Sequence, residues 1–190
     1  MKRLTFGDIG RQDSEFHSER YLIHHLFQDA QYFLDVAKEQ EELNVLMSRR
    51  YLRAAVISAY TALEAWVNTV FEILARVGDL ELHERAFVEE RRIELSGQGY
   101  LELQGKRFHS LDDKLKFLHW RIHGVGISDE QAAWMAFLEA EKLRNKLVHP
   151  SEAKISYSAQ TVVAAQTCAA AVFKVAEMLG WSTPEPDDPT

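Results

Sequence analysis

An arginine, an asparagine and a histidine lie close together in this sequence, directly before a proline, and their side chains could act on phosphate esters. The segment reads Arg144-Asn145-Lys146-Leu147-Val148-His149-Pro150. The planar guanidinium of Arg144 can bind two phosphate oxygens at once. The imidazole of His149, with an ordinary pKa of about 6.5, can accept or donate a proton near neutral pH. These residue types favour phosphoryl chemistry.

Arg144 also falls on an apolar stripe of the helix that the sequence predicts here. Residues at alternating spacings of four and three share that stripe: Ala133, Phe137, Ala140, Arg144 and Leu147. This spacing is typical of one helix face. A cation on a buried face is costly unless it is paired or holds an anion. We therefore expect Arg144 to bind an anion or to form a structural ion pair.

The proline changes the geometry expected at the end of this helix. Pro150 disfavours helical backbone at His149, so we expect the imidazole to leave the helix wheel. Asn145 precedes His149 by four residues and can orient its ring. Lys146 could assist phosphate binding, although a lysine near a helix C-terminus also suits the helix dipole. For His149 too, stabilisation by the dipole is the alternative interpretation.

Glu64 is the expected partner of Arg144. It belongs to a predicted helix over residues 48–77 that is apolar almost all round, and it shares helical spacing with five apolar residues: Ile57, Tyr60, Val67, Phe71 and Leu74. One acid and one base embedded in apolar stripes are natural partners, so we predict that Glu64 lies near Arg144. A pair that only fixes helix packing, as in a helical adaptor, is the alternative.

The bulk composition is that of a compact protein. The chain has 190 residues, of which 46% are hydrophobic and 27% charged, and we expect a single domain over residues 1–181. A net charge of −7 argues against non-specific coating of nucleic acid. The single cysteine, Cys168, is expected to act as a small apolar group. With no secretory signal and no run of about 20 apolar residues, we expect a cytoplasmic protein with no membrane partner.

Helical periodicity dominates, and the sequence predicts an all-α bundle of five or six helices. The expected helices cover about 15–42, 48–77 and 82–94, then one from Ser110, one from a capping box at Ser128 and Gln131, and a last one from Ser158 to about Leu179. Glycines interrupt residues 95–109, which predicts a small hairpin or a loop. A proline-rich acidic tail, 182–190, is expected to be disordered.

The most basic stretch runs from Lys106 to His123. Its cations are Lys106, Arg107, Lys114, Lys116 and Arg121. This stretch could form a surface that faces RNA, although a charge run is more often a solvated helix face. His119 and His123 are one helical turn apart, but no third metal ligand is evident.

At this point the sequence resembles a known family. Residues 144–150 are similar to the Arg-x4-His motif of HEPN domains, in which a polar residue follows the arginine, and residues 51–68 resemble the long early helix of prokaryotic members. The resemblance covers about residues 48–180. It implies a helical bundle, a homodimer, and metal-independent endoribonuclease activity in toxin–antitoxin or antiviral systems.

The resemblance also implies roles for individual residues. Two copies of the motif meet at the dimer interface, Arg144 contacts the scissile phosphate of an RNA substrate, and His149 handles protons beside Asn145. Independently of the resemblance, we expect Glu64 and Lys146 to support this site. The product ends in a 2′,3′-cyclic phosphate, no metal or other cofactor is required, and a cognate antitoxin is a possible partner. The alternative is a catalytically silent HEPN-like module that binds a protein partner or a nucleotide.

Overall fold

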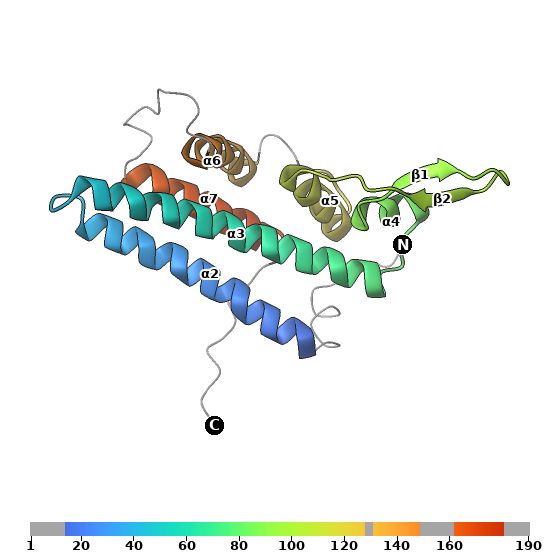
Figure 1. The fold of residues 1–190 in the computed structure, drawn as a ribbon, viewed down its shortest axis with the longest axis horizontal. Helices are drawn as coiled ribbons and strands as arrows, with labels where there is room; N and C mark the ends of the chain where they lie inside the picture. Colours follow the sequence, from blue (N-terminus) through green and yellow to red (C-terminus); the bar gives the residue numbers. More distant parts are fainter. Residues whose placement is uncertain (1–13, 128–130, 149–161, 181–190) are drawn as a thin grey trace. The chain divides into compact units, whose positions relative to one another are not determined.

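The structure is a computed structural model that describes residues 14–127, 131–148 and 162–180, and within them the chain is mostly helical (Figure 1). Its elements are, in order, α2 (Ser14–Glu39), α3 (Val45–Val77), α4 (Leu82–Val88), β1 (Arg92–Leu95), β2 (Leu101–Gln104), α5 (Leu111–His123), α6 (Ala132–Val148) and α7 (Val162–Met178). The predicted helical bundle is confirmed, and the expected interruption after α4 is a hairpin.

The chain forms two compact units, and the boundary between them falls within α3, between Leu63 and Glu64. The first, which we call the helical unit, comprises residues 14–63 together with the described residues after 126. The second, the hairpin unit, comprises residues 64–126. The expectation of a single domain over 1–181 stays a prediction.

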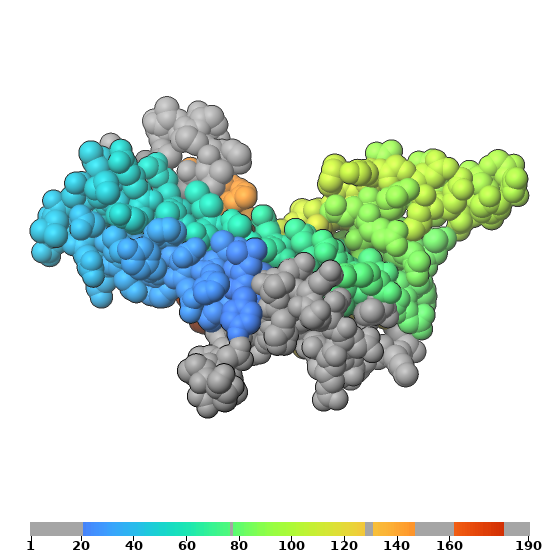
Figure 2. All heavy atoms as spheres, turned by 60° about the horizontal axis from the view of Figure 1, so that its bottom comes forward, coloured from blue at the N-terminus to red at the C-terminus, as the bar shows by residue number. Residues whose placement is uncertain are grey.

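In the helical unit, α2 lies along the first part of α3 (Figures 1 and 2). Near the start of α3, the Ser48 hydroxyl donates to the Ala37 carbonyl of α2 at 2.8 Å. The rings of Phe33 and Tyr51 stack with centroids 6.2 Å apart. One face of α2 is apolar and buried, and its members are Ile23, Phe27, Ala30, Leu34 and Ala37.

The remaining helices of this unit, α6 and α7, pack on each other through small side chains. Cys168 lies 3.7 Å from the Ala140 carbonyl, and both residues are buried. Phe173 of α7 also packs on Phe27 of α2, with ring centroids 4.5 Å apart. Alanines and a cysteine let two helix backbones approach closely, which accounts for the alanine-rich sequence of α7.

One expectation for α3 is wrong. The helix is not apolar almost all round, because one strip of it carries the polar residues Asn68 and Glu72, which face solvent. The apolar Ile57 is also 44% exposed. The other side of the helix is buried, as Val56, Leu63 and Val67 show. A helix in a small bundle has a strip of residues that faces solvent, and in α3 Ile57 is exposed.

The hairpin unit corrects the helix predicted over 82–94. α4 ends at Val88, and Glu90 has a left-handed backbone with φ of 52°. Strand β1 follows, and its sequence Arg-Ile-Glu-Leu alternates charged and apolar side chains, as a strand does. The short helix therefore ends about six residues earlier than its apolar periodicity predicts.

Strands β1 and β2 pair in antiparallel fashion, with Ile93 opposite Leu103 and Leu95 opposite Leu101. At the turn, the Ser96 amide donates to Tyr100 at 2.8 Å and the Gly99 amide donates to Ser96 at 2.9 Å. Gly99 has φ of +86°, so the hairpin has the three-residue turn with a left-handed glycine.

Helix α5 begins where the sequence predicts. The Ser110 hydroxyl accepts a hydrogen bond from the Asp113 amide at its start, and Gly124 ends it with φ of 74°. The expected caps at Ser128 and Ser158 and the tail 182–190 lie outside the described residues. Within the described ranges, no helix combines the length and the apolar character needed to cross a bilayer.

Candidate functional site

The predicted site begins on α6, whose buried face leads to Arg144. Trp134, Phe137 and Ala140 are 1%, 0% and 5% exposed, and Arg144 continues this line as a half-buried residue one turn later. The placement of Phe137 and Ala140 on the buried stripe is confirmed, whereas Ala133 is only half-buried. Burial of the preceding turns fixes the face from which the Arg144 side chain leaves the helix.

An aromatic side chain of α3 supports the guanidinium. The central carbon of the Arg144 guanidinium lies 6.0 Å from the centroid of the Tyr60 ring, at the edge of cation–π range. Tyr60 is itself fixed, because its ring packs on Phe137 at 5.8 Å and its hydroxyl donates to the Phe137 carbonyl at 3.4 Å. The sequence indicates only that Tyr60 shares an apolar helix face, and it does not predict this support.

Asn145 makes a contact that sequence analysis did not predict. Its Oδ1 accepts a hydrogen bond from Nη1 of Arg144 at 2.9 Å, while the residue itself is exposed. Lys146 is also exposed. His149 lies outside the described residues, so the expectation that Asn145 orients its imidazole stays a prediction.

Glu64, the expected partner of Arg144, is half-buried on α3. It belongs to the hairpin unit, whereas Arg144 belongs to the helical unit. The predicted contact between the two side chains therefore stays a prediction. Inside the helical unit, the structure brings together Arg144, Asn145 and Tyr60.

The basic stretch of the hairpin unit is largely engaged in ion pairs. Lys114 pairs with Glu90 at 2.9 Å, and Lys116 pairs with Asp112 at 3.3 Å. The hypothesis of an RNA-facing surface is wrong for Arg121, whose side chain is only 5% exposed. The helix repeat turns this residue inward, which the charge count alone does not reveal.

Arg121 instead forms a buried ion pair with Glu84 of α4. Nη1 of Arg121 lies 3.4 Å from the Glu84 carboxylate, whose side chain is 1% exposed. Nη2 of Arg121 donates to the Asp79 carbonyl at 2.9 Å, and Glu84 also accepts from the Glu81 amide at 2.9 Å. These bonds join α4 to α5 and to the end of α3.

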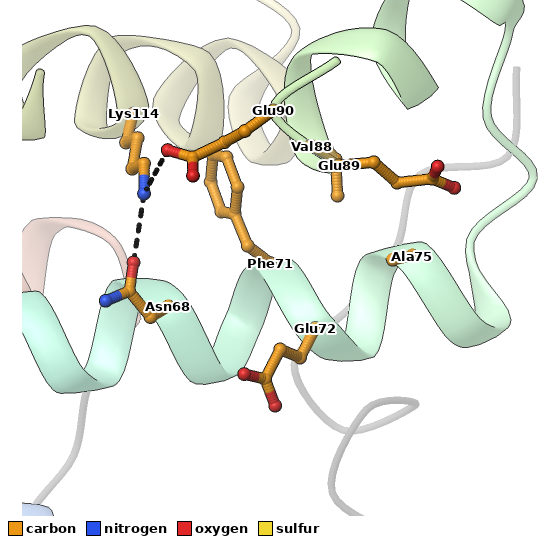
Figure 3. Close-up of a pocket in the computed structure, with 8 residues that line it drawn as sticks. All are labelled: Asn68, Phe71, Glu72, Ala75, Val88, Glu89, Glu90 and Lys114. Carbon is orange, nitrogen blue, oxygen red and sulfur yellow. Dashed lines mark hydrogen bonds and ion pairs between the residues drawn. The ribbon is translucent and has the colours of Figure 1, made fainter. Parts of the chain in front are cut away.

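An open pocket of about 480 Å³ lies in the hairpin unit (Figure 3). Lys114 occupies one end, where its ammonium bridges the Glu90 carboxylate and the Asn68 amide oxygen, 3.0 Å away, with the Phe71 ring behind it. The full lining is Asn68, Phe71, Glu72, Ala75, Val88, Glu89, Glu90 and Lys114. With three carboxylates against one ammonium, this pocket disfavours a phosphate.

The Glu90–Lys114 pair has a defined electrostatic state. Burial raises the pKa of the Glu90 carboxyl, but hydrogen bonds and charge from Lys114 and His109 outweigh it and the net pKa is lowered. Burial, together with the charge of Arg107, lowers the pKa of His109, whose ring lies 3.9 Å from that of Phe87. At neutral pH, these shifts favour an ionised Glu90 carboxylate and a neutral His109 imidazole.

The rings of His119 and His123 lie close together, with centroids 4.5 Å apart and planes tilted by 48°. Nδ1 of His119 lies 3.0 Å from the Val125 carbonyl, which commits one ring nitrogen of this buried residue to the backbone. Among the residues that the structure describes, no three histidine, cysteine, aspartate or glutamate side chains gather closely enough to hold a metal ion.

Comparisons with protein-family models, with curated proteins and with solved structures gave no match. The case for a function therefore rests on the chemistry of the chain itself. Of the groups described above, the guanidinium of Arg144 is the one suited to an anion, because its planar fork of donors matches phosphate or carboxylate oxygens. The pocket beside Lys114 is suited to a cation.

Proposed function

We propose that the protein is a metal-independent endoribonuclease of the HEPN type, acting as a homodimer in a toxin–antitoxin or antiviral setting. The observation that carries the proposal is the environment of Arg144. Its guanidinium lies over Tyr60, donates to Asn145 at 2.9 Å, and leaves α6 from a half-buried position. An aromatic ring and an amide that hold a guanidinium in one orientation prepare it for a planar bidentate contact with phosphate.

The proposed reaction uses the 2′-hydroxyl of RNA as its nucleophile. His149 accepts the 2′-hydroxyl proton, the 2′-oxygen attacks phosphorus, and the bond to the 5′-oxygen breaks as that oxygen takes up a proton. Arg144 binds the non-bridging oxygens, on which negative charge increases in the transition state. The products are a 2′,3′-cyclic phosphate and a 5′-hydroxyl.

The homodimer supplies the second half of the proposed site. In this proposal, one protomer contributes Arg144 to a phosphate on which the His149 of the other protomer acts. Lys146, which is exposed on the same helix end, adds positive charge for the RNA backbone. Glu64 is proposed to hold the arginine from α3.

A cleavage assay in chelator tests the proposal. Purified chain is incubated with a labelled RNA of mixed sequence and with its 2′-deoxy counterpart, and product ends are identified by mass spectrometry. His149→Ala should lower the cleavage rate by about 10²- to 10⁴-fold, as expected for loss of a general acid–base. Arg144→Lys should lower it by about tenfold or more, because a lysine keeps the charge but loses the fork.

Lys142→Ala is the matched control, since Lys142 is an exposed lysine of the same helix, paired with Glu139 at 2.7 Å. It should cleave at the wild-type rate. Melting temperatures of all variants are measured in parallel. Cleavage by His149→Ala at the wild-type rate, or cleavage of the deoxy substrate, would contradict the proposal.

The second candidate is a catalytically silent helical module that binds another molecule. The pocket beside Lys114 favours it, because that pocket is open, about 480 Å³ in volume, and lined by groups suited to a cationic ligand. This candidate predicts no cleavage of any RNA by the wild-type chain.

A further inference from the structure

The hairpin formed by β1 and β2 is amphipathic, and most of its apolar face is exposed within the described residues. Cross-strand pairs place Ile93, Leu95, Leu101 and Leu103 on one face and Arg92, Glu94, Glu102 and Gln104 on the other. Ile93, Leu95 and Leu101 are 39%, 70% and 56% exposed. Figure 2 shows the hairpin extending as an arm beyond α4. An isolated two-stranded hairpin is marginally stable unless a helix packs on it or further strands join it, and joining strands would also cover these exposed side chains.

The polar face of the hairpin carries an unfavourable pair. Glu94 lies directly opposite Glu102, and like charges in that position destabilise a ladder. Glu102 accepts a hydrogen bond from Gln104, but no ion pair to either carboxylate is seen within the described part of the chain. A cation placed beside Glu94 on its outer side would relieve this repulsion.

The outer edge of β1 is able to pair with a further strand. Because Ser96 and Tyr100 are hydrogen-bonded to each other, alternation along the ladder makes Glu94 and Glu102 the next hydrogen-bonded pair. The amides and carbonyls of Ile93 and Leu95 therefore point outward. Within the described residues the sheet contains only these two strands, so β1 is an edge strand.

We propose that β1 pairs with β1 of a second copy of this chain, antiparallel and about a twofold axis through Ile93. The outward groups of Ile93 then bond to those of Ile93 of the partner subunit. Arg92 lies opposite Glu94 of the partner subunit, and Glu94 opposite Arg92 of the partner subunit. The two hairpins then form one four-stranded sheet with a continuous apolar face. Each Glu94 carboxylate lies beside the guanidinium of Arg92 of the partner subunit.

The outward amides and carbonyls of Ile93 and Leu95 permit three antiparallel registers, and the charges of the neighbouring residues favour the one centred on Ile93. Pairing Ile93 with Leu95 of the partner subunit places Glu94 opposite Glu94 of the partner subunit, which adds repulsion. Pairing Leu95 with Leu95 of the partner subunit brings Glu94 opposite an uncharged Ser96. Only the register centred on Ile93 forms two opposite-charge pairs, and a twofold interface makes both at once.

This contact goes beyond the proposed ribonuclease function and does not depend on it. It uses residues of the hairpin unit alone, whereas the proposed RNA site uses the end of α6. Its test reads the distance between two β1 strands and not RNA cleavage, so either proposal can fail while the other stands.

Disulfide trapping in the full-length chain tests the proposal. With Ile93→Cys, the two introduced thiols belong to opposite residues of a hydrogen-bonded pair, about 5.5 Å apart at Cα, which a disulfide can span. With Leu95→Cys, an offset of four residues separates the two Cα atoms by about 13 Å. Leu95 is 70% exposed and Ile93 39%, so random collision favours the control. Cys168 is buried, and the parent chain gives the background.

We expect oxidation to form covalent dimers of Ile93→Cys about tenfold faster than of Leu95→Cys at equal protein concentration. Adding Arg92→Glu to Ile93→Cys turns both of the symmetric pairs between position 92 and Glu94 from attractive to repulsive. This change should slow trapping about tenfold. Adding Glu94→Arg as well exchanges the two charges and should restore the original rate. Equal trapping at positions 93 and 95, or no recovery in the exchanged variant, overturns the proposal.

Discussion

At the residue scale, the largest electrostatic cost in the described structure is carried by Glu84 and Arg121. Their side chains are 1% and 5% exposed, and each loses its hydration on folding. The pair is stable because Arg121 also donates to the Asp79 carbonyl and Glu84 accepts from an amide at the start of α4. Neither residue stands out in the sequence, because Glu84 lies in a short charged helix and Arg121 in a basic stretch.

Removing Arg121 alone should be strongly destabilising. Arg121→Met leaves Glu84 buried without its cation, which costs about 3 to 5 kcal/mol of unfolding free energy, measured by urea denaturation. Lys142→Met is the matched control, because the Lys142–Glu139 pair has side chains that are both 66% exposed and should lose less than about 1 kcal/mol. The double change Glu84→Gln with Arg121→Met should recover much of the loss. Equal losses in Arg121→Met and the control would contradict this account.

Loss of hydration also affects Cys168, a single buried thiol with no charged partner among the described residues. Burial raises the pKa of its thiol to about 12. Relative to an ordinary thiol, the thiolate fraction at neutral pH is then about a thousandfold lower, so reaction with a disulfide reagent should be slower by at least that factor. The measurement compares labelling of the folded chain with labelling in denaturant. Rapid labelling of the folded chain would show that α6 and α7 separate more readily than their packing implies.

At the element scale, boundaries with a local chemical signal are predictable and boundaries set by tertiary contacts are not. Ser110 and Gly124 delimit α5, and both are evident in the sequence. The end of α4 is different, because the sequence of 82–94 remains compatible with a helix. The left-handed Glu90, whose carboxylate reaches Lys114 of α5, ends it. That contact joins residues distant in sequence, and no local pattern reveals it.

The glycine that ends α5 gives a prediction at this scale. Gly124 has φ of 74°, so Gly124→Ala places a Cβ in the left-handed region and should cost about 1 kcal/mol. Gly126 is the control, because a Cβ added there meets nothing within 4 Å and its backbone does not require glycine. Gly126→Ala should change the free energy of unfolding by less than about 0.5 kcal/mol. Thermal denaturation of both variants measures the difference, and equal losses would contradict the role of Gly124 as a cap.

At the scale of the whole molecule, the sequence predicts the helical class because periodicity is repeated over many turns. The Arg144 site is predicted in part for the same reason, since the stripe through Phe137 and Ala140 points to it. Its aromatic support is not predicted, because Tyr60 is 77 residues from Phe137, whose carbonyl holds it. The hydrogen bond from Arg144 to Asn145 is equally invisible to periodicity, since neighbouring residues usually point to different faces of a helix.

The pH dependence of stability is also a property of the whole molecule. The histidines and carboxyls with lowered pKa values all make the folded chain less stable as pH falls. Burial lowers the pKa of His109 and of His119 below the ordinary value of 6.5. The unfolded chain therefore binds these protons first, so the stability they contribute is present above pH 6.5 and is lost as pH falls through the lowered values. For Glu90 and Asp112, burial raises the carboxyl pKa, but hydrogen bonds and nearby cations lower it by more, so the net pKa is lowered. Their contribution is lost on acidification below the ordinary values of 4.5 and 3.8.

We therefore expect the melting temperature to fall in two steps as pH decreases from about 8 to about 3 at constant ionic strength. The double variant His109→Phe with His119→Gln should remove most of the first step, because phenylalanine keeps the packing on Phe87 and glutamine keeps a donor near the Val125 carbonyl. Glu90→Gln should reduce the second step and leave the first unchanged. Calorimetry across the pH range measures both. A first step that persists in the histidine variant would place the responsible protons elsewhere in the chain, because the imidazoles of His109 and His119 would then not be its source.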